Sequence, residues 1–242
     1  MGKKKNAVSA STEVVKTSAA MNYKINLKCK NHKQKELVKS IYENDIIFVE
    51  GVFGVGKTFV INSIALDMLK EPNNGIDKII LILPTVEVGS MCLGHLPGNL
   101  DEKLYNFALN EMDSLRKILK KSGNEDPEKI IDSLVKNEKI DVKPISFLRG
   151  TSIENAFICV SEAEEFTKED LFLIISRFES GKMVISGDPL QASRNQVRNG
   201  NSGLLHAMER LSDIKGVGTI KFTDEDIVRN DILFDIYKKW KD

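Results

Sequence analysis

Residues 51–58 carry the group of residue types best suited to binding phosphate. They read Gly51-Val52-Phe53-Gly54-Val55-Gly56-Lys57-Thr58 and match the pattern G-x-x-x-x-G-K-[ST]. Glycines let the backbone curl so that its N–H groups approach phosphate oxygens closely. In such a loop the lysine reaches the β- and γ-phosphates, and the threonine hydroxyl binds Mg²⁺. The pattern predicts a phosphate-binding loop, although a glycine-rich turn of another kind would share part of it.

Two residues after a later apolar run could complete this chemistry. Residues 157–160 read as a buried strand, and Ser161 and Glu162 follow it. In phosphate-loop folds an acid at the end of such a strand helps to hold Mg²⁺, and a following Glu orients or activates water. Glu162 has the second position, but Ser161 brings no charge to the first. The pattern predicts a slowed hydrolase, and an exposed acidic turn is the alternative interpretation.

Two glutamines are candidates for contacting a nucleotide. Gln34 lies in a predicted helix upstream of the loop, where the amide of a glutamine reads adenine in many helicase-like ATPases. Gln191 ends the segment 187–191, which resembles the loop that carries a glutamine to the γ-phosphate in superfamily one helicases. A solvated glutamine and a plain turn after a strand explain the same residues equally simply.

Apolar periodicity predicts the elements that position these residues. Strands are expected at 46–49, 78–83, 140–147, 157–160, 182–186 and 218–222, and helices at 31–44, 59–69, 101–121, from 126, from a cap at Thr167, at 204–211 and at 231–240. This alternation predicts an α/β fold, with a mostly parallel sheet and helices on both faces. Residues 1–22 read as a disordered basic and polar tail, and residues 23–242 as one domain.

Composition limits the classes of partner. The 242 residues have a formal net charge of +0, 41% apolar and 29% charged residues. A nucleic-acid site must therefore be a local patch. The three cysteines are far apart, which argues against structural disulfides and zinc. No apolar run approaches the length of a membrane span. We expect a soluble, cytoplasmic protein with no membrane partner.

Together these residues resemble the PhoH family of ATPases. The resemblance covers about Asn31 to Trp240 and rests on ordered blocks, several of which are not general features of phosphate-loop proteins. The blocks are 44–48, 51–58, 84–89, 93–98, 147–150, Glu162-Ala163, Gly187-Asp188 with Gln191, 202–204 and 226–229.

The resemblance implies a RecA-like P-loop NTPase core that binds ATP or ADP with Mg²⁺, forms hexameric rings and has RNA-linked roles. Nucleotide contacts are then expected from Gln34, Gly51, Val52, Phe53, Gly54, Val55, Gly56, Lys57, Thr58 and Phe59. Metal contacts are expected from Thr58, Ser161 and Glu162, and catalytic roles for Lys57, Glu162, Gln191 and Arg229. Arg229 would be an arginine finger or sensor, and the alternative is a solvated residue at a helix start.

The sequence also departs from the family pattern near this site. Ser161 and Glu164 stand where the family usually has Asp and Gln, Leu83 replaces an Arg, Ser90 a Glu and Asn230 a His. The changes leave the phosphate cradle intact and predict weakened hydrolysis.

Three functions follow as hypotheses. The first is a slow, Mg²⁺-dependent ATPase that acts as a nucleic-acid-linked ring, with Arg149, Arg194 and Arg198 lining a pore for single-stranded RNA or DNA. The second is a nucleotide-binding regulatory or assembly module that has lost useful catalysis. The third is a small-molecule kinase, against which the segment 187–191 argues.

Overall fold

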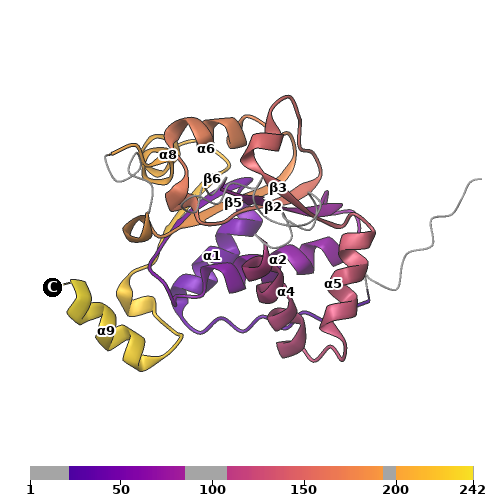
Figure 1. Ribbon diagram of the computed structural model, residues 1–242, viewed down its shortest axis with the longest axis horizontal. Helices are drawn as coiled ribbons and strands as arrows, with labels where there is room; N and C mark the ends of the chain where they lie inside the picture. The colour runs from indigo at the N-terminus through magenta and orange to yellow at the C-terminus, as the bar shows by residue number, and fades with distance from the viewer. Residues whose placement is uncertain (1–21, 85–107, 193–199, 242) are drawn as a thin grey trace, which may run out of the picture.

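A parallel sheet with helices on both of its faces forms the molecule (Figure 1). A computed structural model describes residues 22–84, 108–192 and 200–241. The sheet has six strands in the order β3-β2-β4-β5-β1-β6, and every pairing among them is parallel. The α/β fold expected from the sequence is confirmed.

The strands are short apolar segments, as buried parallel strands should be. They are β1 (Ile46–Glu50), β2 (Lys78–Leu83), β3 (Ile140–Pro144), β4 (Ala156–Val160), β5 (Gly181–Gly187) and β6 (Val217–Lys221). The strand expected over 140–147 is shorter than predicted, because Pro144 lacks the N–H needed to extend the ladder. A 3₁₀ turn, η3 (Ile145–Leu148), follows it.

Helices divide between the two faces of the sheet. Figure 1 shows α1 (His32–Glu43), α2 (Lys57–Lys70), α4 (Leu109–Lys121) and α5 (Pro127–Lys136) on one face, and α6 (Lys168–Ile175) and α8 (Gly203–Leu211) on the other. The final helix, α9 (Asp231–Lys241), lies at the end of the chain and packs the Tyr237 ring edge-on against Phe53, 5.5 Å between centroids.

Side-chain caps fix where several of these helices begin. The predicted cap at Thr167 is confirmed: its hydroxyl accepts the Asp170 N–H, and the Asp170 carboxylate accepts the Thr167 N–H. Asn31 caps α1 through the Gln34 N–H, and Asp126 caps α5 directly before Pro127. Local sequence therefore sets the first turn of each of these helices.

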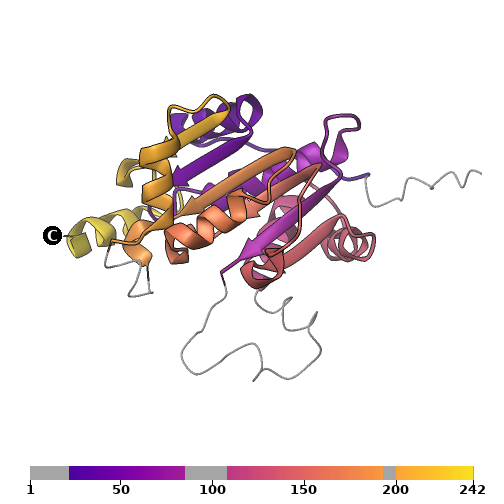
Figure 2. The ribbon, with the colours of Figure 1, turned by 90° about the horizontal axis from the view of Figure 1, so that it is seen from above.

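Two apolar cores hold the layers together. Phe157 packs in the core between the sheet and the α2–α4 face, whereas Phe48 and Phe166 belong to the core under α6 and α8. Because all strands are parallel, their carboxyl ends meet at one edge of the sheet, as the arrowheads in Figure 2 show. Within this sheet β5 lies between β1 and β4.

Several predicted features fall outside the described residues. These are the tail through residue 21, residues 85–107 with the block 93–98, and Arg194 and Arg198. Of the expected helix 101–121, the described part begins at Leu109. Among the described helices, none has the length and apolarity that crossing a membrane requires.

Candidate nucleotide-binding site

The turn from β1 into α2 has the backbone of a phosphate cradle. Gly54 and Gly56 have φ angles of 81° and 84°, in the left-handed region that favours glycine. A Cβ on Gly51 would lie 2.7 Å from the Cβ of Phe222, so only glycine fits there without a shift. The Val60 N–H donates to the Gly56 carbonyl at 3.1 Å and begins the ladder of α2. The glycine spacing read from the sequence thus matches the conformational needs of the turn.

Lys57 lies across the cradle. Its Nζ donates to the carbonyl oxygens of Gly51 and Val52, the latter at 3.1 Å. Burial lowers the pKa of the Lys57 ammonium, while the carboxylates of Asp188, Glu164 and Glu162 act in the opposite direction. The lysine is therefore held inside the turn, among acids from the neighbouring strand ends.

A cavity of about 560 Å³ opens over this turn. Its walls include twelve of the fourteen residues that were predicted to contact the nucleotide or the metal or to act in catalysis; Gly51 and Val55 are the two that do not line it. The twelve are Gln34, Val52, Phe53, Gly54, Gly56, Lys57, Thr58, Phe59, Ser161, Glu162, Gln191 and Arg229. Residues from widely separated parts of the chain thus converge on one cavity.

Gln34 braces the cradle from α1. Its Nε2 donates to the Val55 carbonyl at 2.8 Å, and its Oε1 accepts the Lys30 N–H at 2.8 Å. A primary amide has two N–H bonds and two lone pairs on oxygen, so each end keeps one further position for a ligand. The side chain is buried and contributes both to the loop and to the cavity wall.

Glu162 leaves the end of β4 in an unusual backbone conformation. Its φ of 54° and ψ of 42° are left-handed, which is uncommon for a residue other than glycine. Its side chain hydrogen-bonds that of Glu164, and it is exposed towards the cavity. Such strained positions cluster at functional sites.

Glu164 and Asp188 are buried acids that the sequence analysis named but to which it assigned no role at the site. The Asp188 N–H donates to Glu164 Oε2 at 2.9 Å. Burial, followed by the hydrogen bond and charge of Glu162, raises the pKa of Glu164 to about 8. Asp188 Oδ2 accepts the Gln191 Nε2–H at 2.6 Å and so orients that glutamine at the cavity wall. The raised pKa favours the protonated form of Glu164, whose O–H is suited to donate to the Glu162 carboxylate.

Glu111 is a third acid that sequence reasoning missed. It lies in α4, is 7% exposed and accepts a hydrogen bond from Asn62 Nδ2 at 2.7 Å. Burial raises its pKa, opposed by hydrogen bonds from Asn62 and Ser161. A sequence signal existed, because Glu111 shares the apolar face of its helix with Ala108, Met112 and Leu115.

The segment before α9 closes the rim of the cavity. The Val228 N–H donates to the Gly54 carbonyl at 3.1 Å, and Lys30 Nζ donates to the Val228 carbonyl at 3.2 Å. The Cβ that Gly54 lacks would lie 3.4 Å from that of Arg229. Arg229 is exposed and lines the cavity of its own chain. Arg149, also exposed, follows η3 and is not part of this cavity.

The charges of the cavity suit an anionic ligand with a bound cation. Four further lysines line it, namely Lys28, Lys30, Lys117 and Lys121. In residues 22–84, 108–192 and 200–241, no three His, Cys, Asp or Glu side chains are grouped to hold a metal by themselves. Mg²⁺ commonly binds through one or two carboxylates together with substrate phosphates and water, so the donor set fits a nucleotide-bound Mg²⁺.

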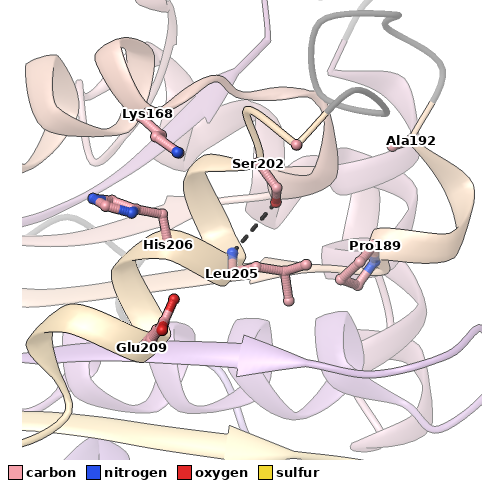
Figure 3. Close-up of a pocket in the computed structure, with 8 residues that line it drawn as sticks. Lys168, Pro189, Ala192, Ser202, Leu205, His206 and Glu209 are labelled. Atoms are coloured by element: carbon pink, nitrogen blue, oxygen red, sulfur yellow. Dashed lines mark hydrogen bonds between the residues drawn. The ribbon is translucent and has the colours of Figure 1, made fainter.

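A second, smaller pocket lies on the face of the sheet that α6 and α8 cover. It has about 320 Å³ and is bordered by α6, α8 and the turn η5 (Pro189–Gln191) (Figure 3). Lys168, His206 and Glu209 mix both signs of charge there, and the dashed line in Figure 3 is the cap of α8, in which Ser202 Oγ accepts the Leu205 N–H. It has no glycine-rich cradle, so the functional assignment rests on the larger cavity.

The fold and the turn at 51–58 define an α/β P-loop protein. A family model described as "PhoH-like protein" matches residues 26–241. The chain belongs to this family. Membership and the P-loop fold support nucleotide binding.

Curated relatives are between 28% and 34% identical to the chain over the aligned residues. A PhoH-like protein of Synechocystis sp. is 34% identical over 208 residues, covering 86% of this chain and 60% of that protein. A PhoH-like protein of Bacillus subtilis is 31% identical over 215 residues, which cover 88% of this chain and 64% of that protein. Protein PhoH of Escherichia coli K12 is 28% identical over 204 residues, which cover 83% of this chain and 54% of that protein. The chain thus spans between 54% and 64% of the length of these relatives.

A solved structure also aligns with the chain. It is the large terminase from a thermophilic bacteriophage in complex with ADP, with a TM-score of 0.45 and 9% identity, over 86% of this chain and 49% of that one.

Proposed function

We propose that the protein binds ATP with Mg²⁺ in the cavity over residues 51–58 and hydrolyses it slowly. The observation that carries the proposal is the convergence of Lys57, Thr58, Glu162, Gln191 and Arg229 on one cavity. Phosphoryl transfer needs little covalent chemistry from a protein and depends on positioning and charge stabilisation. The cavity provides donors, acids and cations for both purposes.

Each residue has a role that its position supports. The backbone N–H groups of the turn and Lys57 would bind the phosphates, and the Thr58 hydroxyl would bind Mg²⁺. When bound, the metal neutralises charge that develops on the phosphate oxygens. Gln34 would contact the base, as the resemblance implies. These roles use only side chains that line the cavity or brace its loop.

Glu162 is the proposed general base. Its carboxylate would accept the proton of the attacking water, while Gln191 and Arg229 respond to the γ-phosphate from the cavity wall. The protonated Glu164 donates to Glu162 and fixes its orientation. Asp188 Oδ2 accepts the Gln191 Nε2–H and orients that side chain. The proposed base Glu162 and the proposed γ-phosphate sensor Gln191 are therefore each held by a buried acid.

A nucleotide-binding module without useful turnover is the second candidate. The uncharged Ser161 favours it, since the usual acid at the strand end is absent. The two functions differ in one measurement, because a module binds ATP and releases no phosphate. Phosphate transferred to an added small acceptor instead of water would indicate a kinase.

Single-stranded nucleic acid and ring assembly are further parts of the proposal. They follow from the family resemblance, and the cavity-rim lysines Lys28, Lys117 and Lys121 offer a cationic surface. Binding of RNA or DNA through such lysines should weaken steeply as salt rises. A binding curve for RNA and DNA that does not depend on salt, or no binding at all, would contradict the nucleic-acid part of the proposal. A protein that stays monomeric with ATP bound would contradict the hexamer. The three widely spaced cysteines, which argue against structural disulfides, favour a cytoplasmic location.

The proposed activity is tested by phosphate release in Mg²⁺-ATP, with and without single-stranded RNA. We expect slow release by the wild type and none by Lys57→Ala. Lys70→Ala is the matched control, because Lys70 ends the same helix and pairs with Asp67 at 3.0 Å on the surface. Equal release by the wild type and Lys57→Ala would overturn the hydrolase.

A further inference from the structure

We infer that Glu111 supplies the carboxylate of the Mg²⁺ site that residue 161 does not. The inference rests on the proposed Mg²⁺-nucleotide function and deepens it. It starts from a buried acid in the cavity wall, tied on one side to the P-loop helix and on the other to the end of β4.

The first tie joins Glu111 to Asn62, which lies one helical turn from the proposed metal-binding residue Thr58. Thr58 and Asn62 are four residues apart in α2, so their side chains lie on one face of the helix, about 5–6 Å apart at Cβ. Asn62 Nδ2 donates to Glu111 Oε2 at 2.7 Å. The carboxylate is thus held at Asn62, in the second turn of α2, on the helix face that carries Thr58.

The second tie places the same carboxylate beside the position where P-loop proteins carry the metal-holding acid. Ser161 directly follows β4, and its side chain hydrogen-bonds Glu111. Thr58, Glu111 and Ser161 all line the same cavity. Glu111 therefore brings a carboxylate from α4 to a point between the two elements that normally share a magnesium ion.

The burial of Glu111 needs an explanation that packing does not give. It is 7% exposed, on the apolar face of α4 with Met112 and Leu115. An ionisable group in such a place is unfavourable unless it is paired or coordinates a metal. Among residues 22–84, 108–192 and 200–241, its bonds come from two neutral side chains, Asn62 and Ser161, and its neighbour Glu162 is itself acidic. A bound cation would provide the missing positive charge.

The test is the gain in nucleotide affinity on adding Mg²⁺, measured with a fluorescent ATP analogue in Mg²⁺ and in EDTA. For Glu111→Gln we expect this gain to fall by about ten-fold or more, as for a lost metal-site partner, with affinity in EDTA unchanged. Glu111→Asp keeps the charge and should keep part of the gain. Asp113→Asn is the matched control, because Asp113 is on the same helix and 54% exposed.

A charge relocation sharpens the experiment. Ser161→Asp alone should bring no larger Mg²⁺ gain, since it sets a second carboxylate against Glu111. In the double variant with Glu111→Gln, the aspartate restores a single acid, and the Mg²⁺ gain should return. This rescue separates a metal role from a packing role, because the double variant still has Gln at position 111 of α4. A defect in the packing of α4 would therefore remain, whereas a missing metal ligand would be replaced.

The outcomes separate this inference from the function beneath it. If the wild type does not bind the analogue in either condition, the proposed function fails and the inference fails with it. If the wild type shows a Mg²⁺ gain that Glu111→Gln retains in full, the inference alone is overturned. Loss in Glu111→Gln without rescue by Ser161→Asp also contradicts it, whereas loss with rescue supports it.

Discussion

The carboxyl group of Glu164 is buried between the Glu162 side chain and the backbone of Asp188. Its pKa, raised to about 8, means that the folded protein holds a proton there that the unfolded chain has released above about pH 4.5. Stability is therefore greatest below the unfolded pKa and is lost as pH rises towards 8. A carboxylic acid at neutral pH presents an O–H donor, as an amide presents an N–H donor.

Glu164→Gln should remove most of this pH dependence. The amide keeps a donor to Glu162 and needs no proton, so we expect a higher free energy of unfolding by about 1 kcal/mol or more at pH 8 and little change at pH 4.5, given that one pKa unit equals about 1.36 kcal/mol. Urea unfolding at pH 5 to 8 measures it. Because burial also raises the pKa of Glu111, a residual slope is expected, and an unchanged slope would contradict the account.

Glu162→Gln should separate binding from turnover. Loss of a general base typically lowers a rate by about 10²–10⁴-fold, while the phosphate cradle stays intact. Phosphate release and ATP affinity, measured on the same preparation, check this. Glu165→Gln, a change in the same 3₁₀ turn (Ala163–Glu165) at a residue outside the cavity wall, is the control. Equal loss in both variants would place the effect in the turn rather than in the base.

At the scale of elements, the P-loop is braced by the two segments that flank it in space. Gln34 from α1 bonds the Val55 carbonyl, and the Val228 N–H bonds the Gly54 carbonyl. Both braces join residues far apart in the sequence. The loop conformation therefore depends on α1 and on the segment before α9 as well as on its own glycines.

Gly54→Ala tests this brace. Its φ of 81° is unfavourable for alanine by roughly 1–2 kcal/mol, and the new methyl group would contact Arg229 and Ile227. Gly75→Ala is matched, because Gly75 has a φ of 79° but nothing within 4 Å. We expect similar destabilisation in both variants but weaker ATP binding in Gly54→Ala alone. Equal ATP affinity in the two would show that the loop tolerates the change.

Local patterns predicted most elements because their signals are local. Apolar runs marked the strands, and the cap at Thr167 and the glycines of the P-loop were readable from neighbours in sequence. The strand expected to reach residue 147 was wrong, because Pro144 ends the ladder. The roles of the buried acids Glu111 and Glu164 were missed for a different reason. Burial by tertiary packing, together with the nearby Glu162, raises the pKa of both Glu111 and Glu164, whereas the hydrogen bonds from Asn62 and from the Asp188 N–H oppose the rise.

At the scale of the whole molecule, two cores on opposite faces of the sheet share the strands that carry the site. Phe157 in β4 is fully buried on the α2–α4 side, four residues before Ser161. The position of the strand end therefore depends on packing inside the sheet. Because both cores pack on these strands, the shape of the cavity depends on packing on both faces of the sheet.

Phe157→Ala should cost about 3–5 kcal/mol, the range for a large buried aromatic. Phe172→Ala is the surface control, because Phe172 is 75% exposed, and we expect a change within about 0.5 kcal/mol. Chemical denaturation of the two variants measures both. Similar losses would mean that the packing around β4 is not what stabilises the sheet.

The central claim is that the cradle at residues 51–58 binds nucleotide through Lys57. The most direct test is an equilibrium titration of the purified protein with ATP in Mg²⁺, in the wild type, Lys57→Ala and Lys70→Ala. The account predicts saturable binding by the wild type and Lys70→Ala, and a loss of at least about ten-fold, or about 1.4 kcal/mol, in Lys57→Ala. Equal affinity in all three proteins, or no binding by the wild type, would contradict it.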